Sequence, residues 1–147
     1  LVVKIDRVGK NISQKFAHKY YSELTVGIDF TARDIQQECK EKGLPWEKAK
    51  AFDGSAPVGK FIPKEKFHNL SDLNFSLKIN GESRQQGNTG DMLFSIDAII
   101  EYVSQFFTVK IGDLIFTGTP EGAGAIGIND SFEAFLEEEK VLDLKIK

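Results

Sequence analysis

The chain has 147 residues, of which 41% are hydrophobic and 28% are charged, and its formal net charge is −3. That length suits a single domain with one core, and the charge gives no indication of a surface that binds nucleic acid or anionic membranes. No apolar run approaches the ~20 residues that span a bilayer. The single cysteine, Cys39, excludes an internal disulfide and fits a reducing compartment.

The chain begins inside an apolar run, because residues 1–5 read Leu-Val-Val-Lys-Ile with no initiator Met and no polar lead-in. This pattern indicates a strand that is already under way at the first residue. A processed start and a missing N-terminal portion both explain it. Of the two we expect the second, so that residues 1–147 form a single domain lacking its N-terminal portion.

The first third of the chain predicts two helices with a buried strand between them. Residues 11–13 supply a capping residue for a short helix over residues 16–21. Residues 23–31 are β-branched and apolar, which indicates a buried strand. Thr31 can then cap a helix over residues 32–42, ahead of the glycine that usually ends a helix.

The middle of the chain predicts a loop and then a hairpin. Residues 46–63 fit no period and are punctuated by Gly and Pro, which is typical of a long ordered loop that carries function. Residues 74–79 alternate between the two faces of a strand. Asn80-Gly81 supplies the positive φ values of a tight turn, and we expect the return strand over residues 82–85.

A helix and three strands are predicted for the rest of the chain. Ser95 caps a helix with an apolar stripe at the i, i+3, i+4, i+7 spacing of a face that packs on a sheet. The stripe consists of Ile96, Ile99, Ile100, Val103 and Phe106. Strands are predicted over residues 114–117, 131–136 and 141–146, with a Gly-rich loop at residues 118–124 and an acidic turn at residues 137–139. Because strands and helices do not alternate as βαβ units, the pattern favours an α+β fold with a mixed sheet.

Asp29 interrupts the apolar run that is predicted as a strand. Burying an unpaired carboxylate there would cost several kcal/mol. A bound cation beside Asp29 would remove that cost, and so would an ion pair with Arg33, a turn that Asp29 caps, or the N-terminus of the following helix. Spacing alone leaves these alternatives open, and a metal ligand is one of them.

Arg33 and Gln36 are three residues apart and therefore share one face near the start of the predicted helix. A guanidinium and helix amide groups together make a carboxylate site, while a solvated or ion-paired arginine is the alternative. Lys50 lies between Ala49 and Ala51, so we expect it to be less exposed than its charged neighbours. Its ammonium group can stabilise an enolate or orient water, and an ordinary surface lysine is the alternative.

Residues 117–120 follow a strand and expose backbone amides through glycine, which is the general design of an anion-binding loop. No Gly-Lys-Ser/Thr follows, so the loop is not a Walker motif, and no helix opens at residues 122–124 to make a dinucleotide fingerprint. A plain strand-to-loop turn is the alternative. His18 and His68 have no ligand partner at metal spacing, and we expect both to be structural or exposed.

Four segments, in order along nearly the whole chain, resemble the motifs of the fumarylacetoacetate hydrolase family. They are residues 27–34 (GIDFTARD) beside NDxSARD, residues 48–53 (KAKAFD) beside GKSFD, residues 80–94 (NGESRQQGNTGDMLF) beside NGExRQxxNTxDMIF, and residues 112–120 (GDLIFTGTP) beside GDxIxTGTP. The insert over residues 41–46 looks most like the small acylpyruvase and oxaloacetate decarboxylase branch of that family.

The resemblance implies a mixed β-sheet roll with short flanking helices, and a homodimer. It also implies an Mg²⁺ or Mn²⁺ site built from an aspartate and a Glu-x-Glu pair. Asp29 matches the aspartate, and the two glutamates are expected upstream of Leu1. The family's catalytic His and Glu lie on a lid still farther upstream. These departures leave open whether residues 1–147 alone bind metal or turn over substrate.

The resemblance also implies roles for residues of this chain. The substrate would be a small 2-oxo acid, which Arg33 and Gln36 would orient. Lys50 would be the catalytic residue that faces the developing enolate, and Thr119 would bind the carboxylate end. Residues 1–147 would then be a catalytic domain.

The function that we predict is that of a metal-dependent hydrolase that cleaves the C–C bond of acylpyruvates, with decarboxylation of oxaloacetate as a further activity. An isomerase or hydratase of dienoic 2-oxo acids keeps the same site and is the first alternative. A non-catalytic small-acid-binding protein or dimer scaffold is the alternative of another class. We expect a cytoplasmic location, or the mitochondrial matrix in a eukaryote, with no nucleic-acid or membrane partner.

Overall fold

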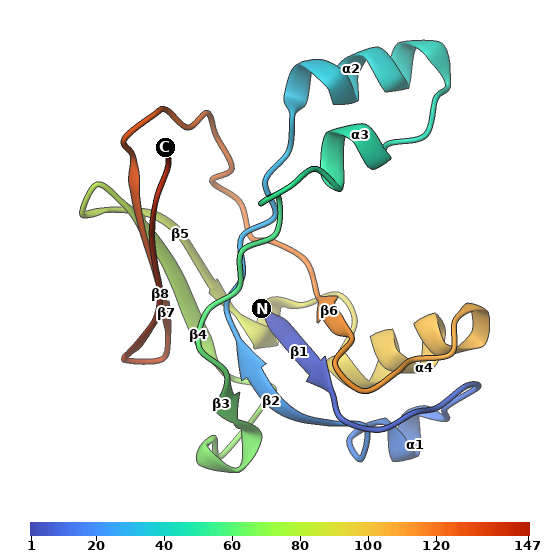
Figure 1. Ribbon diagram of the computed structural model, residues 1–147. Coiled ribbons are helices and arrows are strands. Elements are labelled where there is room, and N and C mark those ends of the chain that lie inside the picture. Colours follow the sequence, from blue (N-terminus) through green and yellow to red (C-terminus); the bar gives the residue numbers. More distant parts are fainter.

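Two antiparallel four-stranded sheets with short helices around them make up the structure, a computed structural model that describes residues 1–147 (Figure 1). The first sheet has the strand order β3-β2-β1-β6 and the second has the order β5-β4-β7-β8. The strands are β1 (Val2–Ile5), β2 (Tyr21–Thr25), β3 (Ile62–Pro63), β4 (Asn74–Ile79), β5 (Glu82–Asn88), β6 (Leu114–Phe116), β7 (Ser131–Leu136) and β8 (Glu139–Lys145). The helices are α1 (Gln14–Ala17), α2 (Arg33–Lys42), α3 (Glu47–Lys50) and α4 (Ile96–Phe106), with 3-10 turns η1 (Lys64–Lys66) and η2 (Thr89–Asp91).

Strand β1 is an inner strand of the first sheet. It pairs with β2 on one side and with β6 on the other, so that Val3 lies opposite Leu24 in β2 and opposite Ile115 in β6. Val2, Val3 and Ile5 are fully buried. A mostly apolar run suits a strand that is covered over most of both faces, which explains why this segment occupies the inner position. Lys4 is the exception, and its Nζ pairs with Glu23 at 2.7 Å.

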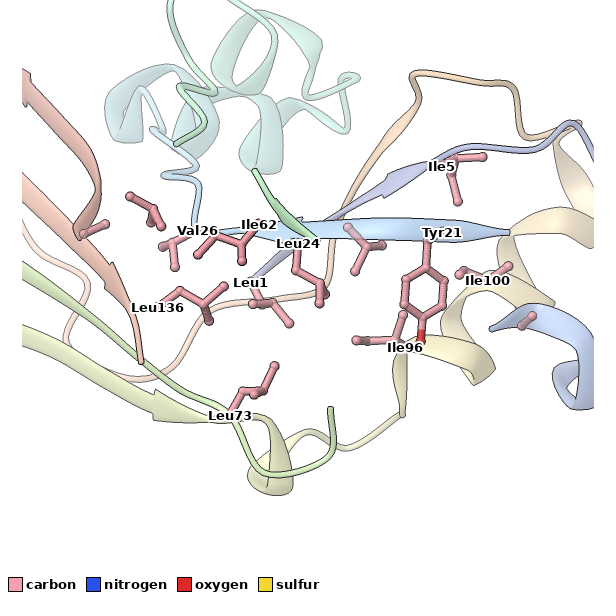
Figure 2. Close-up of a cluster of buried hydrophobic side chains, with 14 of the residues drawn as sticks. Leu1, Ile5, Tyr21, Leu24, Val26, Ile62, Leu73, Ile96, Ile100 and Leu136 are labelled. Carbon is pink, nitrogen blue, oxygen red and sulfur yellow. The ribbon is translucent and has the colours of Figure 1, made fainter. Parts of the chain in front are cut away.

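The hydrophobic core lies between the two sheets and extends to α4. Figure 2 shows Leu1, Leu24 and Leu136 gathered in this core, and Ile96 and Ile100 continue it at the α4 end. The first two residues belong to the first-sheet side, Leu136 ends β7 of the second sheet, and the isoleucines come from α4. Burial of these side chains holds the two sheets together, because each sheet exposes apolar area that only the other can cover.

The β4–β5 hairpin is confirmed at the predicted turn. Asn80 has φ 53° and Gly81 has φ 82°, the left-handed values that a two-residue turn between antiparallel strands requires. Asn80 Nδ2 donates to Asp130 Oδ1 at 2.9 Å, and Ser131 N donates to Asn80 Oδ1 at 3.0 Å. The bond from Asn80 lowers the pKa of the Asp130 carboxyl. The return strand continues to Asn88, beyond the predicted end at residue 85.

Helix α4 is also confirmed, and its predicted apolar stripe holds except at Phe106. The Ser95 hydroxyl accepts from Ala98 N at 3.2 Å, which is the predicted N-cap. Ile96, Ile100 and Ser104 are buried along an i, i+4, i+8 line. Phe106 was predicted within the apolar stripe and is 60% exposed. Ser104 faces Ile12, which lies just before α1. Phe106 is two residues farther along the helix, hence about 200° around its axis, and faces solvent.

Three predictions for the first half of the chain are corrected. The helix expected over residues 16–21 is α1, which ends at Ala17, because β2 already begins at Tyr21. The strand expected over residues 23–31 ends at Thr25. Beyond it, Ile28 N donates to Pro57 O and Phe30 N to Ser55 O, so this segment pairs with a neighbouring loop outside the two sheets. That loop, predicted to be irregular, also contains α3 and β3.

The α+β class is confirmed, and every strand pairing in both sheets is antiparallel. The sequence predicted a mixed sheet. A parallel pair needs a long crossover between its strands, whereas β4 and β5, like β7 and β8, are joined by two-residue turns. No helix of the structure is long and apolar enough to cross a membrane.

Replacing Ser104 by Ala should destabilise the protein. The Ser104 hydroxyl accepts a hydrogen bond from the buried Ile12 N at 2.9 Å and donates to Glu101 O at 2.9 Å. Loss of the hydroxyl leaves a buried N–H without a partner, which costs about 1–3 kcal/mol. Urea denaturation measures the change in the free energy of unfolding. The exposed neighbour Gln105→Ala is the control, and equal stability of the two variants would contradict this role of Ser104.

Candidate functional site

The pairing of β1 brings two distant segments to one edge of the first sheet. Val2 lies opposite Thr25 in β2 and opposite Phe116 in β6. Because both strands are antiparallel to β1, they run in the same direction and leave the sheet at the same end. Asp29 follows shortly after the end of β2 and Thr119 shortly after the end of β6. The sheet therefore directs the two predicted site segments towards each other.

A cleft of about 1200 Å³ opens at this edge. Its wall includes all of the residues predicted from the sequence for the site, which are Asp29, Arg33, Gln36, Lys50 and Thr119. Side chains of the second sheet, among them Phe75 and Phe132, form the apolar part of the wall. A cleft with a mostly apolar wall and a few converging polar groups is the usual form of a small-molecule site.

Lys50 and Asp29 form an ion pair on the cleft wall. Lys50 Nζ lies 2.5 Å from Asp29 Oδ2 and donates to Thr31 Oγ1 at 2.9 Å. The Asp29 side chain is 50% exposed and the Lys50 side chain is 32% exposed. The prediction that Asp29 is buried within a strand is therefore wrong. Its partner is Lys50, whereas Arg33, one of the partners considered from the sequence, bonds to Gln36.

The position of Lys50 depends on the packing of α3 against the start of α2. Ala32 N donates to Ala49 O at 3.0 Å, and Ala49 is fully buried. Figure 1 shows the two helices side by side beyond the edge of the first sheet. The small side chain at residue 49 permits this close approach, so that the next residue, Lys50, reaches back to Asp29 and Thr31.

Thr31 has a different role from the predicted one. The residue at the N-cap of α2 is Ala32, and no side chain caps this end of the helix. The Thr31 hydroxyl instead accepts a hydrogen bond from Lys50 Nζ. The uncapped amide groups of the first turn stay available for an anion, which is the general property of a helix N-terminus.

Arg33 and Gln36 lie together in the first turns of α2. Arg33 Nη1 donates to Gln36 Oε1 at 3.2 Å, and the Gln36 side chain is buried. This bond fixes one side of the guanidinium and leaves its other N–H groups free for a ligand in the cleft. The predicted sharing of one helix face by the two residues is confirmed by this contact.

Thr119 is held by a residue to which the sequence assigned no role. Gln85 Nε2 donates to Thr119 Oγ1 at 3.1 Å and to Pro120 O at 2.9 Å. Gln85 was part of the NGExRQ resemblance, and that motif was the only signal of its importance. Its partner lies 34 residues farther along the chain, in the Gly-rich loop, so spacing alone could not connect them.

The residues of this chain do not form a metal site by themselves. Asp29 is the predicted ligand, and its carboxylate is paired with the ammonium group of Lys50. No group of three His, Cys, Asp or Glu side chains lies close enough to hold an ion. Mg²⁺ and Mn²⁺ prefer several oxygen ligands, so one aspartate is not enough. Further carboxylates would have to come from outside residues 1–147.

The first residue also belongs to the cleft wall. Thr117 N donates to Leu1 O at 3.0 Å, which ties the start of β1 to the segment that leads to Thr119.

Comparison with known proteins gives a consistent result. The family model described as "Fumarylacetoacetate (FAA) hydrolase C-terminal" matches residues 1–147. The mitochondrial oxaloacetate tautomerase FAHD1 of Rattus norvegicus is 46% identical over 147 residues, which are 100% of this chain and 66% of that protein. Oxaloacetate tautomerase YcgM of Escherichia coli is 43% identical over 131 residues, 88% of this chain and 60% of the relative.

A solved structure extends the likeness to three dimensions. Fumarylpyruvate hydrolase from Pseudomonas aeruginosa, in complex with Mn²⁺ and pyruvate, superposes with a TM-score of 0.89 at 34% identity. The match covers 99% of this chain and 64% of that one. The chain thus spans slightly less than two thirds of the length of these relatives. On the match of the family model to every residue, the chain belongs to the fumarylacetoacetate hydrolase family.

Proposed function

We propose that the protein carrying this chain is an enzyme that stabilises the enolate of a small 2-oxo acid, and that keto–enol tautomerisation of oxaloacetate is its reaction. The observation that carries the proposal is the ammonium group of Lys50, which Asp29 and Thr31 hold at the wall of the cleft. The names of relatives that are 46% and 43% identical to the chain support the choice of reaction.

Lys50 is suited to the charge that develops in this reaction. When a proton leaves C3 of a 2-oxo acid, negative charge accumulates on the oxygen at C2. An ammonium group has three N–H donors, and in Lys50 two of them are directed to Asp29 and Thr31. The third is available to the substrate oxygen, where it stabilises the enolate and can supply the proton that makes the enol.

Asp29 holds the Lys50 ammonium group in place without binding it tightly. A partly exposed ion pair contributes at most about 1 kcal/mol, so the ammonium group can turn towards a bound anion at small cost. The pair still fixes the place of the ammonium group when the cleft holds only water. We assign to no residue of this chain the removal of the C3 proton.

Arg33, Gln36 and Thr119 would hold the rest of the substrate. The Arg33 guanidinium and the free amides at the start of α2 favour a carboxylate at that end of the cleft. Thr119 offers a hydroxyl group at the opposite segment. Oxaloacetate carries two carboxylates, and binding both of them orients the carbonyl between them towards Lys50.

Hydrolysis of acylpyruvates is a second candidate. Cleavage of the C3–C4 bond of an acylpyruvate, like decarboxylation of oxaloacetate, leaves the same pyruvate enolate, which Lys50 would stabilise in the same way. The likeness to fumarylpyruvate hydrolase from Pseudomonas aeruginosa favours it. Hydrolysis also needs a base that activates water, and this requirement separates the two reactions.

The Mn²⁺ in the structure of fumarylpyruvate hydrolase from Pseudomonas aeruginosa supports a proposal for the cofactor. We propose that a divalent cation, Mg²⁺ or Mn²⁺, takes one oxygen ligand from Asp29 and the others from carboxylates outside residues 1–147. When bound, such an ion adds positive charge that polarises the 2-oxo carbonyl. We further propose that residues 1–147 are the catalytic domain of a homodimer. The location we propose is the mitochondrial matrix in a eukaryote, as in the mammalian relatives, or the cytoplasm otherwise.

Replacing Lys50 by Met in the full-length protein should lower kcat/KM for oxaloacetate tautomerisation by about 100-fold or more, because the enolate loses its ammonium partner. The ultraviolet absorbance of the enol measures the rate. Lys48→Met removes an exposed lysine from the same helix and should leave the rate near that of the wild type. Near-normal turnover by the Lys50 variant would rule out its assigned role.

The same measurement separates the two candidate reactions. The wild-type protein is assayed with oxaloacetate and with acetylpyruvate. Tautomerisation without hydrolysis supports the first candidate, and hydrolysis without tautomerisation supports the second. Absence of both activities supports the non-catalytic alternative.

Replacing Asp29 by Asn should weaken binding of Mn²⁺ to the full-length protein by about tenfold or more, because a neutral amide is a poorer ligand than a carboxylate. Titration calorimetry measures the dissociation constant. Asp34→Asn, an exposed residue of the same cleft, is the control and should bind as the wild type does. Equal affinities for the two variants would exclude Asp29 from the ligand set.

A further inference from the structure

Gln85 connects the β4–β5 hairpin to the loop that carries Thr119. Its Nε2 donates to Thr119 Oγ1 at 3.1 Å, to Pro120 O at 2.9 Å and, more weakly, to Glu121 O at 3.3 Å. In β5 it pairs with the buried Leu77 of β4, so its backbone is part of the second sheet. The loop therefore takes its position from the sheet through one amide group.

The loop lies directly on β5 because glycine leaves room for it. A Cβ at Gly122 would lie 2.5 Å from Arg84 O, and a Cβ at Gly124 would lie 1.6 Å from Arg84 Nη2. Gly122 also has φ 99°, a value that side chains strongly disfavour. The bonds from Gln85 thus belong to a close contact between loop and strand that Gly122 makes possible.

These contacts determine what the Thr119 hydroxyl group can do. A hydroxyl has one hydrogen to donate and two lone pairs to accept with. The Gln85 amide occupies one of the lone pairs. The hydroxyl donates a long hydrogen bond to Pro120 O at 3.4 Å, and the same carbonyl accepts the shorter bond from Gln85. Because that bond is long, a better acceptor on a ligand in the cleft can replace it at small cost.

We infer that Gln85 is a positioning residue that orients the Thr119 hydroxyl group as a hydrogen-bond donor to a carboxylate of the substrate. The identity of that ligand rests on the proposed function. Gln85 itself acts through Thr119, whose hydroxyl group is the one that touches the substrate. The inference extends the site from the loop to the strand beneath it.

A double-mutant cycle in the full-length protein tests the coupling. Gln85→Leu and Thr119→Val should each lower kcat/KM for oxaloacetate by about tenfold, mainly through a higher KM, because each removes the same carboxylate contact. The double variant should lose about as much as either single variant. A double variant that loses the product of the two effects, about 100-fold, would overturn the inference.

Two further variants control for effects that come from a loss of structure. Gln86→Leu alters the exposed neighbour in β5, whose side chain bonds only to Ser83, and should keep the wild-type KM. An equal rise in KM for Gln85→Leu and Gln86→Leu would overturn the inference. Gln85→Glu keeps the size and polarity of the side chain but cannot donate, so it replaces Gln85→Leu in the cycle if the leucine variant does not fold.

Binding of oxalate, a 2-oxo acid analogue, separates this inference from the proposed function. Titration calorimetry on the full-length protein should show the same tenfold losses and the same lack of additivity without any turnover. A wild-type protein that binds oxalate in this way but converts neither oxaloacetate nor acetylpyruvate would overturn the proposed function and support the role of Gln85. A wild-type protein that does not bind oxalate would overturn the role of Gln85.

Discussion

Burial of β1 between β2 and β6 is the constraint on which the rest of the structure depends. Its apolar residues have no exposed face, so the strand is stable only with a partner on each edge and the second sheet above it. Both partners run antiparallel to it and leave at the same end. The segments that follow them carry Asp29 and Thr119, and the cleft lies between those segments. Packing in the core thereby assembles the polar groups of the site.

The chemistry of the site is concentrated in one ammonium group with two fixed acceptors. Asp29 and Thr31 direct Lys50 along the cleft wall, and Ala49 sets its distance by packing α3 on α2. A half-exposed pair of this kind is weak, so the ammonium group can adjust towards a substrate oxygen at little cost. In the function that we propose, the same aspartate also serves as a ligand to a cation.

How much could be predicted from the sequence depended on how local each signal was. The turn at Asn80-Gly81 and the cap at Ser95 were found because each is decided by neighbouring residues. The run after Thr25 was misread as a strand because its partner is a loop outside the sheets. Helix α3 was missed because four residues have no period, and packing through Ala49 makes it helical.

For the site residues, too, local patterns were predictable and contacts between distant residues were not. The order of the family motifs selected five residues that all line one cleft, although each was ambiguous by spacing alone. The ion pair of Asp29 with Lys50 and the bond of Gln85 to Thr119 join residues 21 and 34 positions apart. No local pattern contains such pairs, because tertiary packing creates them.

A crystal structure of the full-length protein with bound oxalate tests the central claim most directly. An oxalate oxygen is expected within hydrogen-bond distance of Lys50 Nζ, with Thr31 still accepting from the same ammonium group and Thr119 at the other end of the ligand. Oxalate bound outside the cleft, or a Lys50 side chain turned away from the ligand, would contradict the role of this lysine as the group that faces the enolate.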